Sequence, residues 1–200
     1  MTRDDRDIAA FDARAGSYEG GWLGGLHHRI ADRTADLALT AAAAPERILD
    51  VGCGTGYLLR QLDARCPDAV ELTGVDPARA MIAAARAAAA GERLRWLEGT
   101  AEELPFPEGS FDLVVSTTSF DHWADQRAGL GECARVLAPG GWLVLTDLFS
   151  ALLAPTLLGS RRHKARTRRR ASQLLAAAGF RGAQWHDVEG VIIRTVTARR

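Results

Sequence analysis

The segment Ile48-Leu-Asp-Val-Gly-Cys-Gly-Thr-Gly56 decides how this chain is interpreted. Its apolar beginning predicts a short buried strand, and glycine then stands at every second position before an expected helix. Glycine allows the backbone to turn sharply and to approach a ligand closely, and the N-terminus of the next helix lies nearby. Asp50 lies on the strand, and burying a carboxylate there is unfavourable unless a polar partner interacts with it. The pattern predicts a ligand site at the end of the strand; the alternative is a tight turn without a ligand.

Strands and helices alternate on both sides of this segment. Short apolar runs bounded by turn residues predict strands, and longer runs with helical spacing or many alanines predict helices. The expected strands are Arg47–Val51, Glu71–Val75, Leu94–Glu98, Phe111–Ser116 and Trp142–Thr146. The expected helices are 3–15, 26–43, 57–64, 78–90, 126–137 and 171–178. Alternation at this spacing indicates right-handed strand–helix–strand units and a mainly parallel sheet.

Two further strands are expected near the C-terminal end, at Gly182–Val188 and Val191–Thr197. Only Glu189 and Gly190 join them. A parallel crossover needs a dozen or more residues, so these two strands must form an antiparallel hairpin. The sequence therefore predicts an α/β fold with five strands of the parallel type and a terminal hairpin.

The composition is that of an ordinary globular chain, but its charges are unevenly distributed. The 200 residues suit one domain, and 47% hydrophobic with 25% charged residues argues against disorder. A formal net charge of zero argues against a whole-chain nucleic-acid binder. Residues 1–160 hold 14 arginines and 23 acidic residues, whereas residues 161–200 hold 11 basic and 2 acidic residues. Seven of those basic residues lie in the basic segment, 161–170.

The cysteines and the N-terminal residues indicate a reducing compartment. Cys53, Cys66 and Cys133 are odd in number and lack the spacing of metal ligands. The charged N-terminal residues lack the apolar core of a signal peptide, and no run approaches the ~18–20 apolar residues of a membrane span. These features predict a cytoplasmic protein with free thiols and no metal site.

Four motifs in order resemble the class I S-adenosylmethionine-dependent methyltransferases, most closely the small-molecule group that includes type 11 and the ubiquinone and menaquinone methyltransferases. They are ILDVGCGTG (48–56), TGVDPARAMI (73–82), LEGTAEELPFPEGSFDLVVS (97–116) and ECARVLAPGGWLVLTDL (132–148). The G-x-G-x-G spacing differs from the G-x-G-x-x-G of dinucleotide-binding folds. The resemblance extends from about Phe11 to the C-terminal residues.

This resemblance implies a doubly wound, Rossmann-like sheet of seven strands in the order 3-2-1-4-5-7-6, mainly parallel with the last strand antiparallel. It implies N-terminal cap helices in residues 1–45, placed over the cofactor and the substrate. Residues 46–200 would form the methyltransferase core, with a short basic lid at 148–170.

The resemblance also implies S-adenosylmethionine as cofactor and S-adenosylhomocysteine as product. Asp76 would accept hydrogen bonds from both ribose hydroxyls, since two carboxylate oxygens match a vicinal diol. The family often has Asp where this chain has Thr100, whose hydroxyl accepts a hydrogen bond from adenine without charge assistance. The other residues implied to surround the cofactor are Tyr18, Asp50, Gly52, Cys53, Gly54, Gly56, Pro77, Met81, Ala101, Glu102 and Ser116.

The segment after the fourth strand, 117–123, is expected to face the methyl group. It lacks the Asn/Asp-Pro-Pro-Tyr/Phe sequence that binds planar amino groups, which disfavours an N-methyltransferase of that kind. His122 is the candidate catalytic base because the ordinary pKa of histidine is near neutral; the alternative is that it packs the loop. The residues expected in the substrate pocket are His27, Thr117, Phe120 and Trp123.

The implied reaction is in-line transfer of a methyl group to an oxygen or carbon of a small organic molecule. The basic segment predicts an anionic or carrier-bound acceptor, or else a solvated helix surface. Nucleic acid is disfavoured by the acidic remainder of the chain, and a short lid leaves both a monomer and a homodimer open. Two alternatives stand: an RNA or protein methyltransferase that uses residues 161–170, and a member of the fold that binds the cofactor without methylating.

Overall fold

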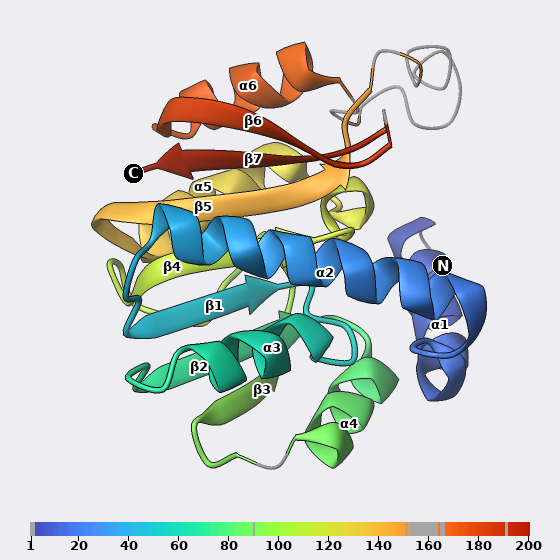
Figure 1. Ribbon diagram of the computed structural model, residues 1–200. Helices are drawn as coiled ribbons and strands as arrows, with labels where there is room; N and C mark the ends of the chain where they lie inside the picture. The colour runs from blue at the N-terminus through green and yellow to red at the C-terminus, as the bar shows by residue number, and fades with distance from the viewer. Residues whose placement is uncertain (1–2, 90, 151, 153–163, 165–166, 191) are drawn as a thin grey trace.

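The computed structural model describes residues 3–89, 91–150, 152, 164, 167–190 and 192–200. Within these residues the chain forms a seven-stranded sheet in the order β3-β2-β1-β4-β5-β7-β6, with helices on both faces (Figure 1). The strands are β1 (Arg47–Val51), β2 (Glu71–Asp76), β3 (Leu94–Glu98), β4 (Phe111–Thr117), β5 (Leu137–Leu148), β6 (Arg181–Glu189) and β7 (Ile193–Arg199). The helices are α1 (Arg3–Arg14), α2 (Gly21–Ala41), α3 (Tyr57–Arg65), α4 (Arg79–Ala88), α5 (Gln126–Val136) and α6 (Arg168–Ala177), with short 3-10 turns η1 (Ala15–Ser17) and η2 (Phe120–His122). The expected fold class and strand order are confirmed.

The sheet is parallel from β3 to β5 and antiparallel beyond. β1 pairs in parallel with β2 and β4, and the parallel pairing continues to β3 and β5. β7 lies between β5 and β6 and is antiparallel to both, as the predicted hairpin requires. Because parallel strands end at the same edge of a sheet, the last residues of β1, β2 and β4 meet there, at Val51, Asp76 and Thr117.

Two apolar cores lie on the two faces of the sheet. Ile48 and Leu113 point to the face covered by α2 and α3, whereas Leu49 and Val114 point to the face covered by α5 and α6. This alternation follows from the two-residue period of a strand. Since both faces are covered, the central strands read as continuous apolar runs, as expected for a parallel sheet.

The two N-terminal helices occupy different positions. α2 packs along the sheet, where Ala35 and Ala38 are fully buried beneath it. α1 lies at the carboxyl-end edge of the sheet, near the N-terminus in Figure 1, and packs on α4. Of the segment 1–45, α1 therefore lies over the strand ends, whereas α2 packs mainly along the sheet and reaches the strand ends with its N-terminal part.

Three element boundaries differ from the sequence prediction by three residues or more. α2 begins at Gly21 instead of residue 26, and Gly24 in its first turn lies so close to the backbone of Glu19 that a Cβ there would come within 2.2 Å of its carbonyl oxygen. β5 begins at Leu137 instead of Trp142, and Leu137 pairs with Phe111 ahead of a register irregularity. α6 begins at residue 168, inside the basic segment, where the sequence prediction began it at 171. Gly24, in a stretch that looked like a break, is thus a site of close backbone packing.

Part of the predicted lid lies outside the described residues. Of the basic segment 161–170, the structure describes residues 164 and 167–170. The expectations for 151, 153–163 and 165–166 therefore have no structural outcome. Among the helices of the described chain, none has the length and apolar character needed to cross a membrane.

Candidate functional site

The glycine turn after β1 is tied to the end of β2. The backbone amides of Gly52 and Cys53 both donate to the Val75 carbonyl oxygen, at 2.8 and 3.1 Å. Gly52 has φ +77°, and a Cβ there would lie 2.3 Å from Ser119 Oγ, so only glycine fits. Gly54 has φ +54°, but a Cβ there would meet no atom within 4 Å. The turn therefore leaves an open space directly over Gly54.

A cavity with two arms opens at this turn. The larger arm extends over the ends of β2 and β3 and beneath α1, and the smaller arm extends between the glycine turn and α2. The two arms share the lining residues Tyr18, Gly52, Gly54, Thr117 and Thr118. The site thus lies at the carboxyl ends of the parallel strands, where the sequence placed it.

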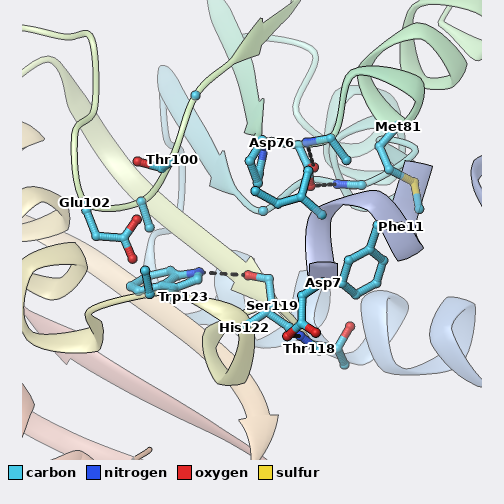
Figure 2. A pocket seen from close by; sticks show the side chains of 18 of the residues that line it. Asp7, Phe11, Asp76, Met81, Thr100, Glu102, Thr118, Ser119, His122 and Trp123 are labelled. Carbon is cyan, nitrogen blue, oxygen red and sulfur yellow. Dashed lines mark hydrogen bonds and ion pairs between the residues drawn. The ribbon is translucent and has the colours of Figure 1, made fainter. Parts of the chain in front are cut away.

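Asp76 stands at the centre of the larger arm. It is 8% exposed, its Oδ2 accepts the Gly54 amide, and its Oδ1 accepts the Ala78 amide, both at 2.9 Å (Figure 2). Burial raises the pKa of this carboxyl, while the two amide donors lower it. Each carboxylate oxygen can accept a second hydrogen bond, so the fixed carboxylate presents two acceptors to the cavity.

Three buried polar atoms with neither a hydrogen-bond nor an ion-pair partner among the described residues line the smaller arm, where a fourth buried atom, His28 Nε2, lies 3.5 Å from Glu19 Oε2. The three are Asp50 Oδ1, His27 Nδ1 and Thr117 Oγ1, from β1, α2 and β4. Burial, and next the charge of Asp76, raise the pKa of Asp50 to about 8. Buried polar atoms are nearly always satisfied, and each exception calls for an explanation such as a ligand. The smaller arm therefore has the character of a binding site for a polar, charged group.

The far end of the larger arm combines apolar and polar walls. Pro77 and Met81 line one side, and Thr100, Ala101 and Glu102 of the loop after β3 line the other. Met81 is 1% exposed and lies in a small apolar cluster with residues of α1. Figure 2 shows Thr100 and Glu102 on the side of the cavity opposite Met81. Such a slot suits a flat, mostly apolar ring with a polar edge.

Ser119, which the sequence prediction missed, organises the segment after β4. Its Oγ donates to the Val51 carbonyl oxygen at 2.9 Å and accepts from Trp123 Nε1 at 3.2 Å. Its neighbour Thr118 has φ 53°, a left-handed conformation that is strained for a β-branched residue. Thr118 lines both arms, so the strain falls at their junction.

Three predicted site residues do not reach the cavity. Gly56 has φ +80°, and its missing Cβ makes room for the Trp96 ring, so it serves packing. Ser116 is fully buried and shares a hydrogen bond with Ser119 Oγ. Phe120, expected in the substrate pocket, is 1% exposed and packs on Phe149 in the core because η2 turns it inward. Neither arm is lined by any of the three.

The other predicted residues do line the cavity. Trp123 and Thr117 lie in the larger arm, and Thr117 lies in the smaller arm as well. Cys53 lines the smaller arm, and burial raises the pKa of its thiol. Tyr18 lines both arms, and its ring lies 5.1 Å from that of His27. His27 therefore belongs with the smaller arm, beside Asp50, instead of with Trp123.

His122 lines the larger arm and contacts α1. Its Nδ1 lies 3.5 Å from Asp7 Oδ2, and its ring meets the Phe11 ring edge-on at 5.0 Å. Figure 2 shows Asp7, Phe11 and His122 together on one side of the cavity. Asp7 was not predicted as a site residue, because nothing local in a polar helix distinguishes it. In the described part of the chain, no cluster of three or more His, Cys, Asp or Glu side chains offers a metal site.

The basic segment touches the site at one described point. Lys164 Nζ donates to the backbone carbonyl oxygen of Trp123, on the wall of the larger arm. Arg168, at the start of α6, lies over the Trp185 ring instead, 5.4 Å from its centre.

Comparison with known proteins gives a family and a fold. The family model described as a methyltransferase domain matches residues 49–145. The demethylmenaquinone methyltransferase of Thermus thermophilus is 49% identical over 117 residues, which cover 58% of this chain and 52% of that protein. The malonyl-[acyl-carrier protein] O-methyltransferase of Geobacter sulfurreducens is 34% identical over 197 residues, covering 91% of this chain and 72% of that protein.

The structural comparison extends over the whole chain. A chain of the solved complex that contains the Haloferax volcanii Trm112 methyltransferase activator has a TM-score of 0.80 and 21% identity, covering 100% of this chain and 99% of its own. At that identity the likeness shows the fold. Against several curated relatives, by contrast, this chain spans about half of their length.

Proposed function

Because this chain belongs to the class I S-adenosylmethionine-dependent methyltransferases, we propose that it transfers a methyl group from S-adenosylmethionine to an oxygen or carbon of a small organic molecule. The observation that carries this proposal is the smaller arm, where three buried polar atoms lack partners. The amino-acid end of the cofactor has both donors and acceptors, and a polar group of this kind would satisfy all three atoms.

The residues of the cavity fit the cofactor in charge and shape. S-adenosylmethionine carries positive charge on its sulfur and its amino group, and Asp50 with Asp76 supplies two buried carboxylates on the cavity wall. The open space over Gly54 lets the cofactor lie against the backbone, where a side chain would block it. Asp50 Oδ1 would accept from the amino group, and His27 and Thr117 would face the carboxylate.

The larger arm would hold the adenosine part. The two outward acceptor positions of Asp76 would receive the ribose hydroxyls, which keeps the sequence-based role for that residue. Adenine would lie between Met81 and the loop of Thr100 and Ala101. The Thr100 hydroxyl would meet the polar edge of adenine without charge assistance.

When bound, S-adenosylmethionine supplies an activated methyl carbon, and the chain supplies binding, alignment and the exclusion of water. The segment 117–123 lies beside both arms and would align the acceptor with that carbon. His122 would serve as the base for an acceptor that must lose a proton.

The acceptor class is a proposal drawn from the named relatives. One relative acts on demethylmenaquinone and the other on the malonyl group of an acyl-carrier protein. Both acceptors are small organic groups, one a quinone ring and the other a carboxylate attached to a carrier. These are the two acceptor kinds to assay first.

The test is a methyl-transfer assay with isotope-labelled S-adenosylmethionine. The acceptors are a demethylmenaquinone analogue, in its quinone and hydroquinone forms, and a malonyl thioester. Label in at least one organic product, at a rate above the enzyme-free control, is the expected result. Saturable cofactor binding with no transfer to any of them would favour a binding protein built on the same fold. Transfer to RNA or protein alone would overturn the small-molecule proposal.

A further inference from the structure

A carboxylate and an imidazole from distant parts of the chain meet in the larger arm. Asp7 Oδ2 lies 3.5 Å from His122 Nδ1, and the two side chains are 36% and 33% exposed. Both residues line the cavity. Asp121, the sequence neighbour of His122, is only 5% exposed and lines neither arm. The carboxylate that faces the imidazole from the cavity side therefore comes from α1.

α1 is fixed well enough to hold Asp7 in place. Asp12 Oδ1 accepts the Ala80 amide at 2.8 Å, which fastens the end of α1 to the first turn of α4. Ile8 and Phe11 pack on a cluster that contains the buried Met81. Phe11 also meets the His122 ring edge-on, so the same helix supports the imidazole with an apolar contact and with a charge.

We propose that Asp7 is a positioning residue for His122, and that the pair serves an acceptor bearing a hydroxyl group, such as a phenol, enol or hydroquinone. This inference rests on the proposed methyltransferase function. If the Asp7 carboxylate accepts a hydrogen bond from Nδ1–H, the imidazole is held in the tautomer whose lone pair lies on Nε2. A fixed tautomer and ring orientation are what a general base needs from its supporting carboxylate.

The proton transfer explains why the pair favours a hydroxyl. A phenol has an ordinary pKa of about 10 and is protonated at neutral pH, so a base must remove its proton before or during methylation. A carboxylate acceptor, with an ordinary pKa of about 4, is already ionised and needs no base. A carboxylate–imidazole pair facing the cavity therefore assists methylation of a hydroxyl acceptor but is not needed for a carboxylate acceptor.

The step balances without any further reactant. The acceptor O–H bond breaks, and its proton passes to His122 Nε2. The electron pair left on the acceptor forms the new bond to the methyl carbon, through oxygen or through a ring carbon that the oxygen activates. In the second case the hydrogen on that ring carbon then leaves as a proton, the oxygen regains a proton, and the aromatic ring is restored. The bond between the methyl carbon and sulfur breaks, and its electron pair stays on the sulfur of S-adenosylhomocysteine.

The first experiment needs no acceptor. Nitrogen-15 NMR of the histidines, well above the ordinary histidine pKa, reports the tautomer of His122 in the wild type, Asp7→Ala and Asp7→Glu. The wild type is expected to show the Nδ1–H form, Asp7→Ala to shift toward the Nε2–H form, and Asp7→Glu to restore the wild-type signal. An unchanged His122 signal in Asp7→Ala would overturn the positioning role.

The second experiment measures turnover with hydroquinone and malonyl-thioester acceptors. Asp7→Ala should lower kcat for the hydroquinone by about 10- to 100-fold, because losing the positioning residue removes part of the rate enhancement from general base catalysis. The KM for the cofactor should be unchanged. The matched control is Arg6→Ala, which removes an exposed charge from the same helix and should leave turnover unchanged. Equal losses in both variants would assign the effect to α1 as a whole and overturn the proposal.

The malonyl thioester separates the two acceptor classes. Turnover of that acceptor alone, with none of the hydroquinone, would overturn the hydroxyl class even if the tautomer result holds. If the wild type methylates no acceptor of any kind, the proposed function fails, whereas the NMR result still decides whether Asp7 orients His122.

Discussion

The two sides of the cavity are built in different ways. The side that we propose for the cofactor, the cofactor side, consists of strand ends, backbone amides and buried carboxylates: Asp76 is 8% exposed and is held by the amides of Gly54 and Ala78. The side that we propose for the acceptor, the acceptor side, consists of side chains from separate elements. Its Asp7 and His122 side chains are each about one-third exposed, and Asp7 Oδ2 lies 3.5 Å from His122 Nδ1. Groups fixed by backbone hydrogen bonds keep one geometry, whereas partly exposed side-chain pairs are easier to change.

On this proposal, residues of the cofactor side carry the methyl-transfer activity shared with the family, and residues of the acceptor side determine which acceptor is methylated. The cofactor side follows from motifs that lie on contiguous sequence. The acceptor side depends on α1 and on the segment after β4, which are more than a hundred residues apart. Substitutions on the cofactor side should therefore lower cofactor affinity or stability, whereas substitutions on the acceptor side should lower turnover.

The largest effect is expected from Gly52→Ala on the cofactor side. Its Cβ would lie 2.3 Å from Ser119 Oγ at φ +77°, so overpacking adds to backbone strain and stability should fall by about 3 kcal/mol or more. Gly54→Ala is the matched control, because its Cβ meets open space and strain alone costs about 1–2 kcal/mol. Chemical denaturation compares the two.

Gly54→Ala should keep its fold and lose cofactor affinity, because the new methyl group occupies the space over the turn. Equal stability losses in the two alanine variants would contradict the close approach at Gly52. Undiminished cofactor affinity in Gly54→Ala would contradict the placement of the cofactor against the turn.

On the acceptor side, His122→Ala should reduce turnover of a hydroquinone acceptor by about 100-fold or more, the scale of general base catalysis. Cofactor affinity should stay within about twofold, because His122 lines the larger arm and is not among the residues proposed to hold the cofactor. His186→Ala, on β6 and away from both arms, is the control and should leave turnover unchanged. Full turnover in His122→Ala would reject the base.

The buried carboxylate on β1 predicts a pH dependence. Burial raises the pKa of Asp50 to about 8, from an ordinary value of 3.8. Folded protein then holds a proton that the unfolded chain releases, so stability falls as pH rises from about 4 to about 8 and levels off above. The slope for one such group reaches about 1.4 kcal/mol per pH unit.

Denaturant unfolding at several pH values tests this expectation. Asp50→Asn should flatten the slope, whereas Asp68→Asn, an exposed carboxyl, should leave it in place. Affinity for S-adenosylmethionine should rise with pH over the same range in the wild type, because the cation binds the ionised carboxylate. An Asp50→Asn variant with the wild-type pH slope would refute the raised pKa.

The smallest effect is expected at Thr100, at the far end of the larger arm. Thr100→Asp would give adenine a charged acceptor, and charge-assisted hydrogen bonds are roughly twice as strong as neutral ones. Affinity for S-adenosylmethionine should tighten by about fivefold, near 1 kcal/mol. Calorimetric titration compares the affinity for S-adenosylmethionine of the wild type, Thr100→Asp and Thr100→Val, which lacks the hydroxyl. A lower affinity in Thr100→Asp than in the wild type would contradict the placement of adenine beside Thr100.

Much of the fold and of the cofactor side was predictable because the signals are local. The hairpin follows from its spacing, whereas the strand order and the cavity positions of Asp50 and Asp76 follow from the family resemblance that the four motifs carry. One boundary error, the start of α2, arose where a glycine allows close packing: Gly24 admits the backbone of Glu19 against the first turn of α2.

The rest of the site depends on contacts between distant residues. Ser119 joins β1 to the segment after β4 through a carbonyl 68 residues away, and no pattern around a serine announces that role. Asp7 looks like any polar residue of a solvated helix until α1 is folded over the strand ends. Phe120 was expected in the pocket because its neighbours are there, but η2 turns it into the core.

The central claim is that the cofactor side binds S-adenosylmethionine and the acceptor side does not contribute to that binding. Calorimetric titration of S-adenosylmethionine into the wild type, Asp76→Ala and His122→Ala tests it most directly. We predict saturable binding by the wild type, a loss of about 1.5 kcal/mol or more in Asp76→Ala, the scale of charged hydrogen bonds, and nearly wild-type affinity in His122→Ala. No binding by the wild type, or unchanged affinity in Asp76→Ala, would contradict the account.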